Sequence, residues 1–139
     1  MRAALPAASR PIDNVPAMHT VTGLVKRSPD ACWRVLVDPT GYHTWIPALR
    51  RARVVDSYDT GLAREVRFEL ATERTFSRLY SYDLAKQEMS WKPRGDGTSG
   101  FARLEAIDGG TKLTYSLEGP SEYDLDKFMA SFQSYLHAY

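Results

Sequence analysis

Residues 28–47, SPDACWRVLVDPTGYHTWIP, contain the clearest helix signals in the chain. Ser28 can accept a hydrogen bond from an unpaired backbone amide, Pro29 suits the first helical position, and an acidic residue follows in the first turn. These signals predict a helix that stops at the Asp-Pro pair of residues 38–39, because the residue before a proline disfavours the helical conformation. By the same rule, a second short helix is predicted around residues 40–45, ahead of the next proline.

On both sides of this stretch the hydrophobic pattern is that of strands. Val66, Phe68 and Leu70 alternate with charged residues, which is typical of a half-buried strand. Glycine-containing turn signals separate such segments from one another. Strands are therefore predicted near residues 20–25, 53–58, 66–70, 75–83, 88–92, 100–107 and 112–118. Apolar residues then recur at helical spacing through residues 124–139 and predict one C-terminal helix.

This order of elements predicts an α+β fold, since a long antiparallel sheet needs a helix to cover one of its faces. If the sheet curls around that helix, the space between them is a candidate pocket. No internal repeat or linker divides residues 18–139. We therefore expect one domain there, preceded by a flexible leader over residues 1–17.

The composition argues against several classes of protein. Eighteen basic and seventeen acidic residues leave a formal charge of +1, which gives no general attraction to nucleic acid. No window approaches the ~20 apolar residues of a membrane-spanning helix, and the first 17 residues lack the apolar run of a signal peptide. Cys32 is the only cysteine, so no internal disulfide forms, and we expect a cytoplasmic protein.

Two groups of motifs resemble the START-related polyketide cyclase/dehydrase superfamily (SRPBCC). They are SPDACW at residues 28–33 with DPTGYHTWIP at 38–47, and Ser90-Trp91 with Gly100 and TKLTY at 111–115. The resemblance covers residues 18–139 and implies the helix-grip fold. In that fold a curved seven-stranded antiparallel sheet surrounds a C-terminal helix and a hydrophobic cavity, with two short helices after the first strand. Relatives include aromatase/cyclases, ubiquinone-binding proteins and lipid carriers, so the fold is better determined than the function. Their C-terminal helix is usually longer than residues 124–139.

The resemblance also implies which side chains line the cavity. Independently, one face of the strand at 100–107 carries Gly100, Ala102, Leu104 and Ala106, and such small residues leave volume unless the helix moves in close. Tight packing of the helix on the sheet is an equal alternative at this point. The expected ligand-binding residues are Tyr42, Trp45, Phe68, Leu79, Ser81, Trp91, Ala102, Leu104, Tyr115, Phe128 and Phe132.

The strand at residues 75–83 has two interpretations. By hydrophobicity, its aromatic residues at 76, 80 and 82 face inward and carry Arg78 with them. By the phase of the family, Ser77, Leu79 and Ser81 face inward, which gives the pocket two hydroxyls for an oxygenated ligand. We follow the family phase. The aromatic row would then be exposed and could mark a contact between the subunits of a homodimer.

No pattern identifies a catalyst, a metal or a cofactor. The histidines at 19, 43 and 137 lack the spacing of a metal site, and residues 95–100 (GDGTSG) fit a hairpin turn better than a dinucleotide loop, because no helix follows them. We therefore expect neither a cofactor nor a metal, and assign no catalytic residue. Loose candidates for proton transfer are Tyr42, His43, Arg78, Ser81 and Asp83.

The leading prediction is binding of an apolar or aromatic small molecule, such as a polyketide, quinone, fatty acid or isoprenoid, in an internal cavity. One alternative is a polyketide aromatase/cyclase or dehydratase that acts on a carrier-tethered intermediate. Another is a protein-interaction module without a ligand. Arg50, Arg51 and Arg53 form a basic cluster, which is either a solvated edge or a docking site for an acidic partner such as an acyl carrier protein.

Overall fold

A computed structural model describes residues 18–95, 97–118 and 124–138 of the chain. The leader expected over residues 1–17 lies outside the described residues. The helices are α1 (Pro29–Leu36), the 3-10 helix η3 (Pro39–Thr44) and α2 (Leu125–Ala138). The strands are β1 (Met18–Val25), β2 (Leu49–Ser57), β3 (Ala63–Leu70), β4 (Thr75–Asp83), β5 (Glu88–Pro93), β6 (Ser99–Ile107) and β7 (Gly110–Glu118).

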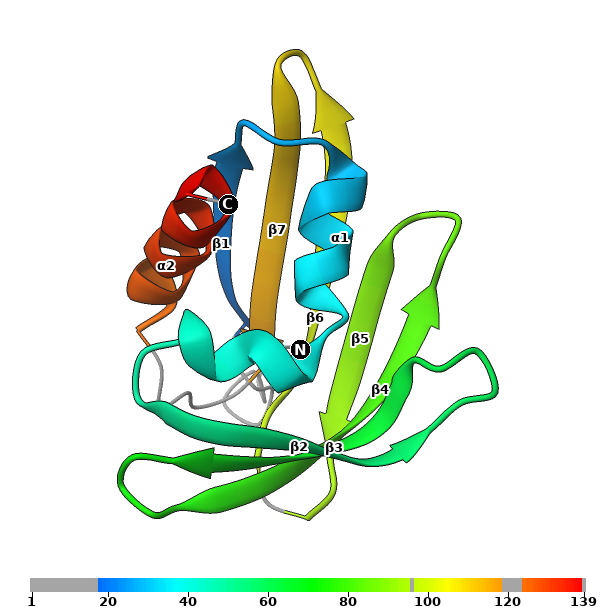
Figure 1. Ribbon diagram of the computed structural model, residues 1–139, viewed down its shortest axis with the longest axis vertical. Coiled ribbons are helices and arrows are strands. Elements are labelled where there is room, and N and C mark those ends of the chain that lie inside the picture. Colours follow the sequence, from blue (N-terminus) through cyan, green and yellow to red (C-terminus); the bar gives the residue numbers. More distant parts are fainter. Residues whose placement is uncertain (1–17, 96, 119–123, 139) are drawn as a thin grey trace, which may run out of the picture.

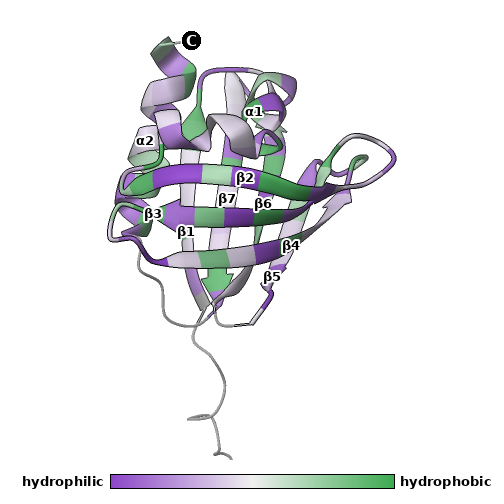
Figure 2. Cartoon of the chain, turned by 60° about the horizontal axis from the view of Figure 1, so that its bottom comes forward, coloured by the Kyte–Doolittle hydropathy of each residue, from purple (hydrophilic) through white to green (hydrophobic). Residues whose placement is uncertain are grey.

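The described strands form one antiparallel sheet in the order β1-β7-β6-β5-β4-β3-β2. The sheet is strongly curved: β1, β7 and β6 run upright in Figure 1, whereas β2 and β3 cross below them. Figure 2 shows hydrophilic and hydrophobic residues alternating along β2 and β3, as expected for strands with one solvated face. The α+β helix-grip prediction is confirmed, including the two short helices after the first strand.

The motif at residues 28–47 forms the two helices for the expected reasons. The Ser28 hydroxyl accepts a hydrogen bond from the Ala31 amide at 3.2 Å and caps α1. The Asp38 carboxylate accepts a bond from the Thr40 amide at 3.2 Å and caps η3. The buried Tyr42 hydroxyl donates to the carbonyl oxygen of Leu36. This bond holds η3 against the end of α1.

The helices cover the concave face of the sheet. α2 packs against β1, α1 against β6 and β7, and η3 against β2. The approach of α2 is close, because a Cβ added at Gly23 on β1 would lie only 2.4 Å from the Met129 sulfur. Phe132 and Leu136 of α2 are fully buried in this layer.

The phase expected for β4 from the family is wrong. Arg78 and Tyr80 are buried, at 6% and 2% exposure, whereas Ser81 is exposed and Leu79 only half-buried. The strand follows its own hydrophobicity, since turning a tyrosine inward buries far more apolar surface than turning a serine inward. The exposed aromatic row is therefore not present, and the contact between subunits predicted through it loses its basis.

Candidate functional site

An interior cavity lies between the curved sheet and the helices. Its water-accessible space is about 20 Å³, which is room for one water molecule. α1, η3 and the loop after it, α2 and strands β3, β4, β5 and β7 all contribute to its wall. The lining residues are Leu36, Tyr42, Trp45, Ile46, Phe68, Arg78, Tyr80, Met89, Trp91, Tyr115 and Phe128.

The sequence located part of this wall. The expected residues that line the cavity are Tyr42, Trp45, Phe68, Trp91, Tyr115 and Phe128. Leu79 and Ser81 do not line the cavity, because their side chains lie on the other face of β4. Ala102, Leu104 and Phe132 are buried in the core but do not border the cavity. Five residues line the cavity that were not among the expected ligand-binding residues: Leu36, Ile46, Arg78, Tyr80 and Met89. The alternation of aromatic residues along 76–82 was the signal that could have identified Arg78 and Tyr80.

The small-residue face of β6 does not open the cavity. A Cβ at Gly100 would lie 2.2 Å from the Ser116 carbonyl oxygen and 2.8 Å from the Trp91 ring. Ala102 is fully buried and Ala106, near the end of the strand, is exposed. Neighbouring atoms thus fill the space that glycine and alanine leave, and the cavity lies instead toward β4 and β5.

Aromatic rings form most of the wall and contact one another in a chain. The Tyr115 ring lies 4.2 Å from Phe128 and 5.2 Å from Trp91 between ring centroids. Trp45 continues the chain, 5.3 Å from Phe128 and 5.6 Å from Tyr42. Such a lining favours flat apolar molecules, which contact the faces and edges of the rings.

Arg78 brings a positive charge into this apolar wall. Its guanidinium carbon lies 4.9 Å from the centre of the Trp91 ring and 5.4 Å from those of Phe68 and Phe76. Cation–π attraction offsets part of the cost of burying the charge. Burial raises the pKa of Tyr80 although the charge of Arg78 opposes the rise, so its hydroxyl stays protonated near neutral pH.

Trp91 adds a second polar group to the same wall. Its side chain is buried, at 5% exposure. Among the described residues, none provides a hydrogen-bond partner for its indole N–H. A buried donor left without a partner is costly and rare in folded proteins. Trp91, which lines the cavity, therefore has a buried donor that is not satisfied by the described residues.

The other candidates for proton transfer do not meet in the cavity. His43, Ser81 and Asp83 are exposed. The Tyr42 hydroxyl already donates to the Leu36 carbonyl, and burial raises the pKa of Tyr42 well above its ordinary value. Of the loose candidates, Arg78 and Tyr42 line the cavity.

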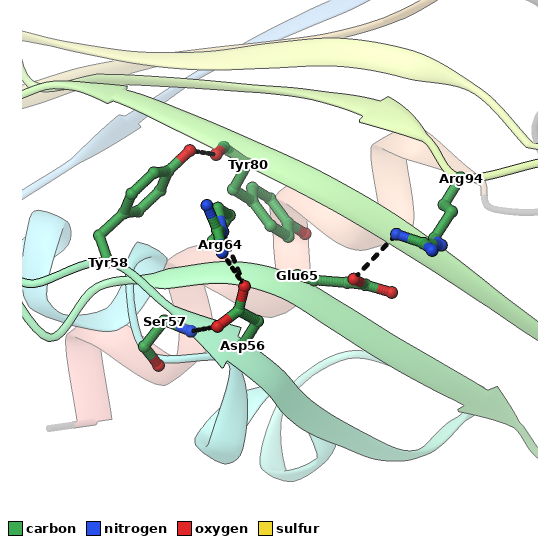
Figure 3. A network of polar contacts seen from close by, with 7 residues as sticks. All are labelled: Asp56, Ser57, Tyr58, Arg64, Glu65, Tyr80 and Arg94. Atoms are coloured by element: carbon green, nitrogen blue, oxygen red, sulfur yellow. Dashed lines mark hydrogen bonds and ion pairs between the residues drawn. The ribbon is translucent and has the colours of Figure 1, made fainter.

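Hydrogen bonds outside the cavity fix the strand that carries Arg78. Figure 3 shows Tyr58, which follows β2, donating to the Tyr80 carbonyl oxygen at 2.6 Å. Tyr82 donates to the Ala63 carbonyl on β3, also at 2.6 Å. Arg94, just after β5, pairs with Glu65 on β3 at 3.3 Å. The first two bonds connect β4 to β3 and to the residue that follows β2, and the ion pair connects the end of β5 to β3.

A surface groove also borders Trp45. It has a volume of about 420 Å³ and is lined by Thr44, Trp45, Ala130, Ser131, Ser134 and Tyr135. η3 and α2 form its two sides. Trp45 borders both spaces.

The remaining candidates form no second site. In the ranges 18–95, 97–118 and 124–138, no three His, Cys, Asp or Glu side chains cluster as metal ligands would. Cys32 is fully buried, and burial raises the pKa of its thiol. Arg50, Arg51 and Arg53 are exposed on β2, where Arg51 pairs with Glu69 at 3.1 Å. No helix of the described chain is long and apolar enough to cross a membrane.

A curved sheet that holds a C-terminal helix over an aromatic cavity defines a protein of the helix-grip class. Residues 18–134 match the family described as polyketide cyclase / dehydrase and lipid transport, and the chain belongs to that family. No curated protein matches the sequence.

Solved structures share this fold. A START superfamily protein from Mycobacterium smegmatis is 16% identical, with a TM-score of 0.67 over 87% of this chain and 91% of that one. The Zhui aromatase/cyclase from Streptomyces sp. R1128 is 18% identical, with a TM-score of 0.64 over 88% of this chain and 84% of that one. A protein from Thermus thermophilus is 11% identical, with a TM-score of 0.72 over 88% of this chain and 98% of that one. At these identities the likeness concerns the fold alone.

Proposed function

We propose that the chain binds one apolar, aromatic small molecule in the cavity between the sheet and the helices. The observation that carries the proposal is the wall itself. Aromatic rings from α2, η3 and four strands converge on one interior space that also contains a buried charge and a buried N–H donor. Ligand sites typically combine a mostly apolar lining with a few polar groups.

Binding requires the wall to move, because the present space holds only a water-sized molecule. Trp45 is the side chain whose displacement joins the cavity to the groove of about 420 Å³. The groove is thus the entrance, and the indole re-packs when a ligand enters. Burial of the ligand's surface, at roughly 25 cal/mol per Å², offsets the cost of that movement.

The cavity supports binding better than cyclisation or dehydration. A general base works best with a pKa near the operating pH. Burial raises the pKa of Tyr42 and Tyr80 away from that range, and the exposed His43 and Asp83 lie outside the wall. The family description names both catalysis and lipid transport, and we place this chain with the binding proteins.

The test is a titration with the neutral dye N-phenyl-1-naphthylamine, followed by dye fluorescence. We expect saturation at one dye per chain and a higher melting temperature at excess dye, by mass action. Leu36→Phe adds a ring to the cavity wall and should weaken binding about tenfold or more. Leu24→Phe is the matched control, because Leu24 is 60% exposed on β1.

Equal affinity of the wild type and Leu36→Phe would contradict the proposal. So would the absence of saturable binding by the wild type. In either case the aromatic residues would be ordinary core residues. A protein-interaction module without a ligand would then be the better-supported function.

A further inference from the structure

We infer that the outer face of the sheet binds a phosphate group, either free or as part of a phospholipid head group, over a row formed by Arg53, Arg67, Ser77 and Arg94. The row lies on the face of the sheet opposite to the cavity. The inference goes beyond the proposed function and does not depend on it, because no residue of the row lines the cavity.

Strand register places these four residues side by side. Arg53 on β2 lies directly opposite Arg67 on β3, and Arg67 lies directly opposite Ser77 on β4. The amide of Arg94, just after β5, donates to the Ser77 carbonyl oxygen at 3.0 Å. The three arginines are exposed and Ser77 is half-buried, whereas the adjacent residues at positions 52, 68 and 78 are buried. Because neighbouring strands lie about 4.8 Å apart, the guanidiniums of Arg53 and Arg67 can reach one bound group.

The acidic residues of β2 and β3 are already paired. Asp56 pairs with Arg64, Glu65 with Arg94 at 3.3 Å and Glu69 with Arg51 at 3.1 Å. Figure 3 shows the first two of these pairs. In the ranges 18–95, 97–118 and 124–138, neither Arg53 nor Arg67 forms an ion pair, and Arg67 donates to the Thr75 hydroxyl at 3.5 Å. The described chain therefore leaves two positive charges facing each other without an acidic group between them.

Arg53 and Arg67 repel each other when no anion is bound. Like charges directly opposite one another on neighbouring strands destabilise a sheet. A phosphate between them reverses this effect, because each guanidinium can donate two parallel hydrogen bonds to its oxygens. Phosphate also has an oxygen left for the Ser77 hydroxyl, which can donate. The arginine pair therefore indicates a site for an anion with several oxygens.

The experiment follows the side-chain Nε–H signals of the arginines by nuclear magnetic resonance while inorganic phosphate replaces chloride at constant ionic strength. We expect the signals of Arg53 and Arg67 to shift together and to saturate. Arg53→Gln should weaken phosphate binding about tenfold or more, as for the loss of one bidentate contact. Arg103→Gln is the matched control, because it removes the same charge from the outer face of β6, where Arg103 pairs with Glu88 at 3.0 Å. It should leave the phosphate affinity unchanged.

A second measurement detects the repulsion itself. In phosphate-free buffer of low ionic strength, where screening is weak, Arg53→Gln should melt about 1–4 °C higher than the wild type. Phosphate should remove that difference, since it stabilises the wild type by mass action. Arg103→Gln should not gain stability, because it breaks an ion pair.

Vesicles distinguish the two sources of the phosphate group. Co-sedimentation with vesicles that contain phosphatidylglycerol, but not with pure phosphatidylcholine, and its loss in Arg53→Gln would assign the site to a lipid head group. Saturable binding of inorganic phosphate without co-sedimentation would assign the site to a free phosphate.

The inference is overturned if neither inorganic phosphate nor the phosphatidylglycerol vesicles bind. It also fails if Arg53→Gln and Arg103→Gln weaken binding equally, because the effect would then be one of net charge. A melting temperature of Arg53→Gln equal to or below that of the wild type at low ionic strength would contradict it as well. N-phenyl-1-naphthylamine should bind the wild type and Arg53→Gln equally, so a failure here leaves the proposed function standing.

Discussion

Gly100 lies where two neighbouring groups leave no room for a side chain. An added Cβ would meet a backbone oxygen of β7 at 2.2 Å and the Trp91 ring at 2.8 Å. The backbone oxygen cannot rotate away as a side chain can. Glycine at this position therefore lets β6 approach β7 and leaves room for the Trp91 ring.

We expect Gly100→Ala to lower the free energy of unfolding by about 1–3 kcal/mol, the usual cost of overpacking, in a denaturant titration. Gly41→Ala in η3 is the control, because a Cβ there would meet Asp38 at 3.8 Å, an ordinary contact. If the two variants had equal stability, β6, β7 and the Trp91 ring would be able to move apart at little energetic cost, which would contradict this account.

At the scale of elements, η3 and α2 form the sides of the groove that we propose as the entrance, and Trp45 contacts both. The indole lies 5.2 Å from the ring of Phe132 and 6.3 Å from that of Tyr135, both on α2. It is the residue common to the walls of the cavity and the groove. On the proposed function, we expect entry of a ligand to change the contact between these two helices.

A smaller ring at this position should open the entrance. We expect Trp45→Phe to raise the association rate of N-phenyl-1-naphthylamine several-fold in stopped-flow fluorescence, because binding that waits for a conformational change is slower than simple encounter. Trp33→Phe is the matched control, since Trp33 lies on α1 against Tyr82 and does not border the cavity. An unchanged rate for Trp45→Phe would place the entrance elsewhere.

The elements themselves were largely predictable from the sequence. Capping residues determined α1 and η3, and alternation with turn signals located the strands. The phase of β4 was not predicted, because the resemblance to the family outweighed the hydrophobicity of its own aromatic residues. For that reason Arg78 and Tyr80 were not among the expected ligand-binding residues, and Ser81 was wrongly included.

At the scale of the whole molecule, the position of the cavity depends on how the sheet curls. The sheet curls so that β2 and β3 cross below β1 and β7 (Figure 1), and residues of β4, β5, η3 and α2, far apart in the sequence, line one cavity. Periodicity shows which face of a strand is buried, but not which buried residues border a space and which contact one another. Ala102, Leu104 and Phe132 were assigned to the cavity for that reason.

The central claim is that a ligand enters this interior space, and the methionines can test it. Met89 lines the cavity, whereas Met129 is buried against β1. With methyl-labelled methionine and bound N-phenyl-1-naphthylamine, nuclear Overhauser effects should connect the dye to the Met89 methyl group and not to that of Met129. Contacts confined to Ala130 and Tyr135 in the groove, with an unshifted Met89 methyl signal, would contradict the account.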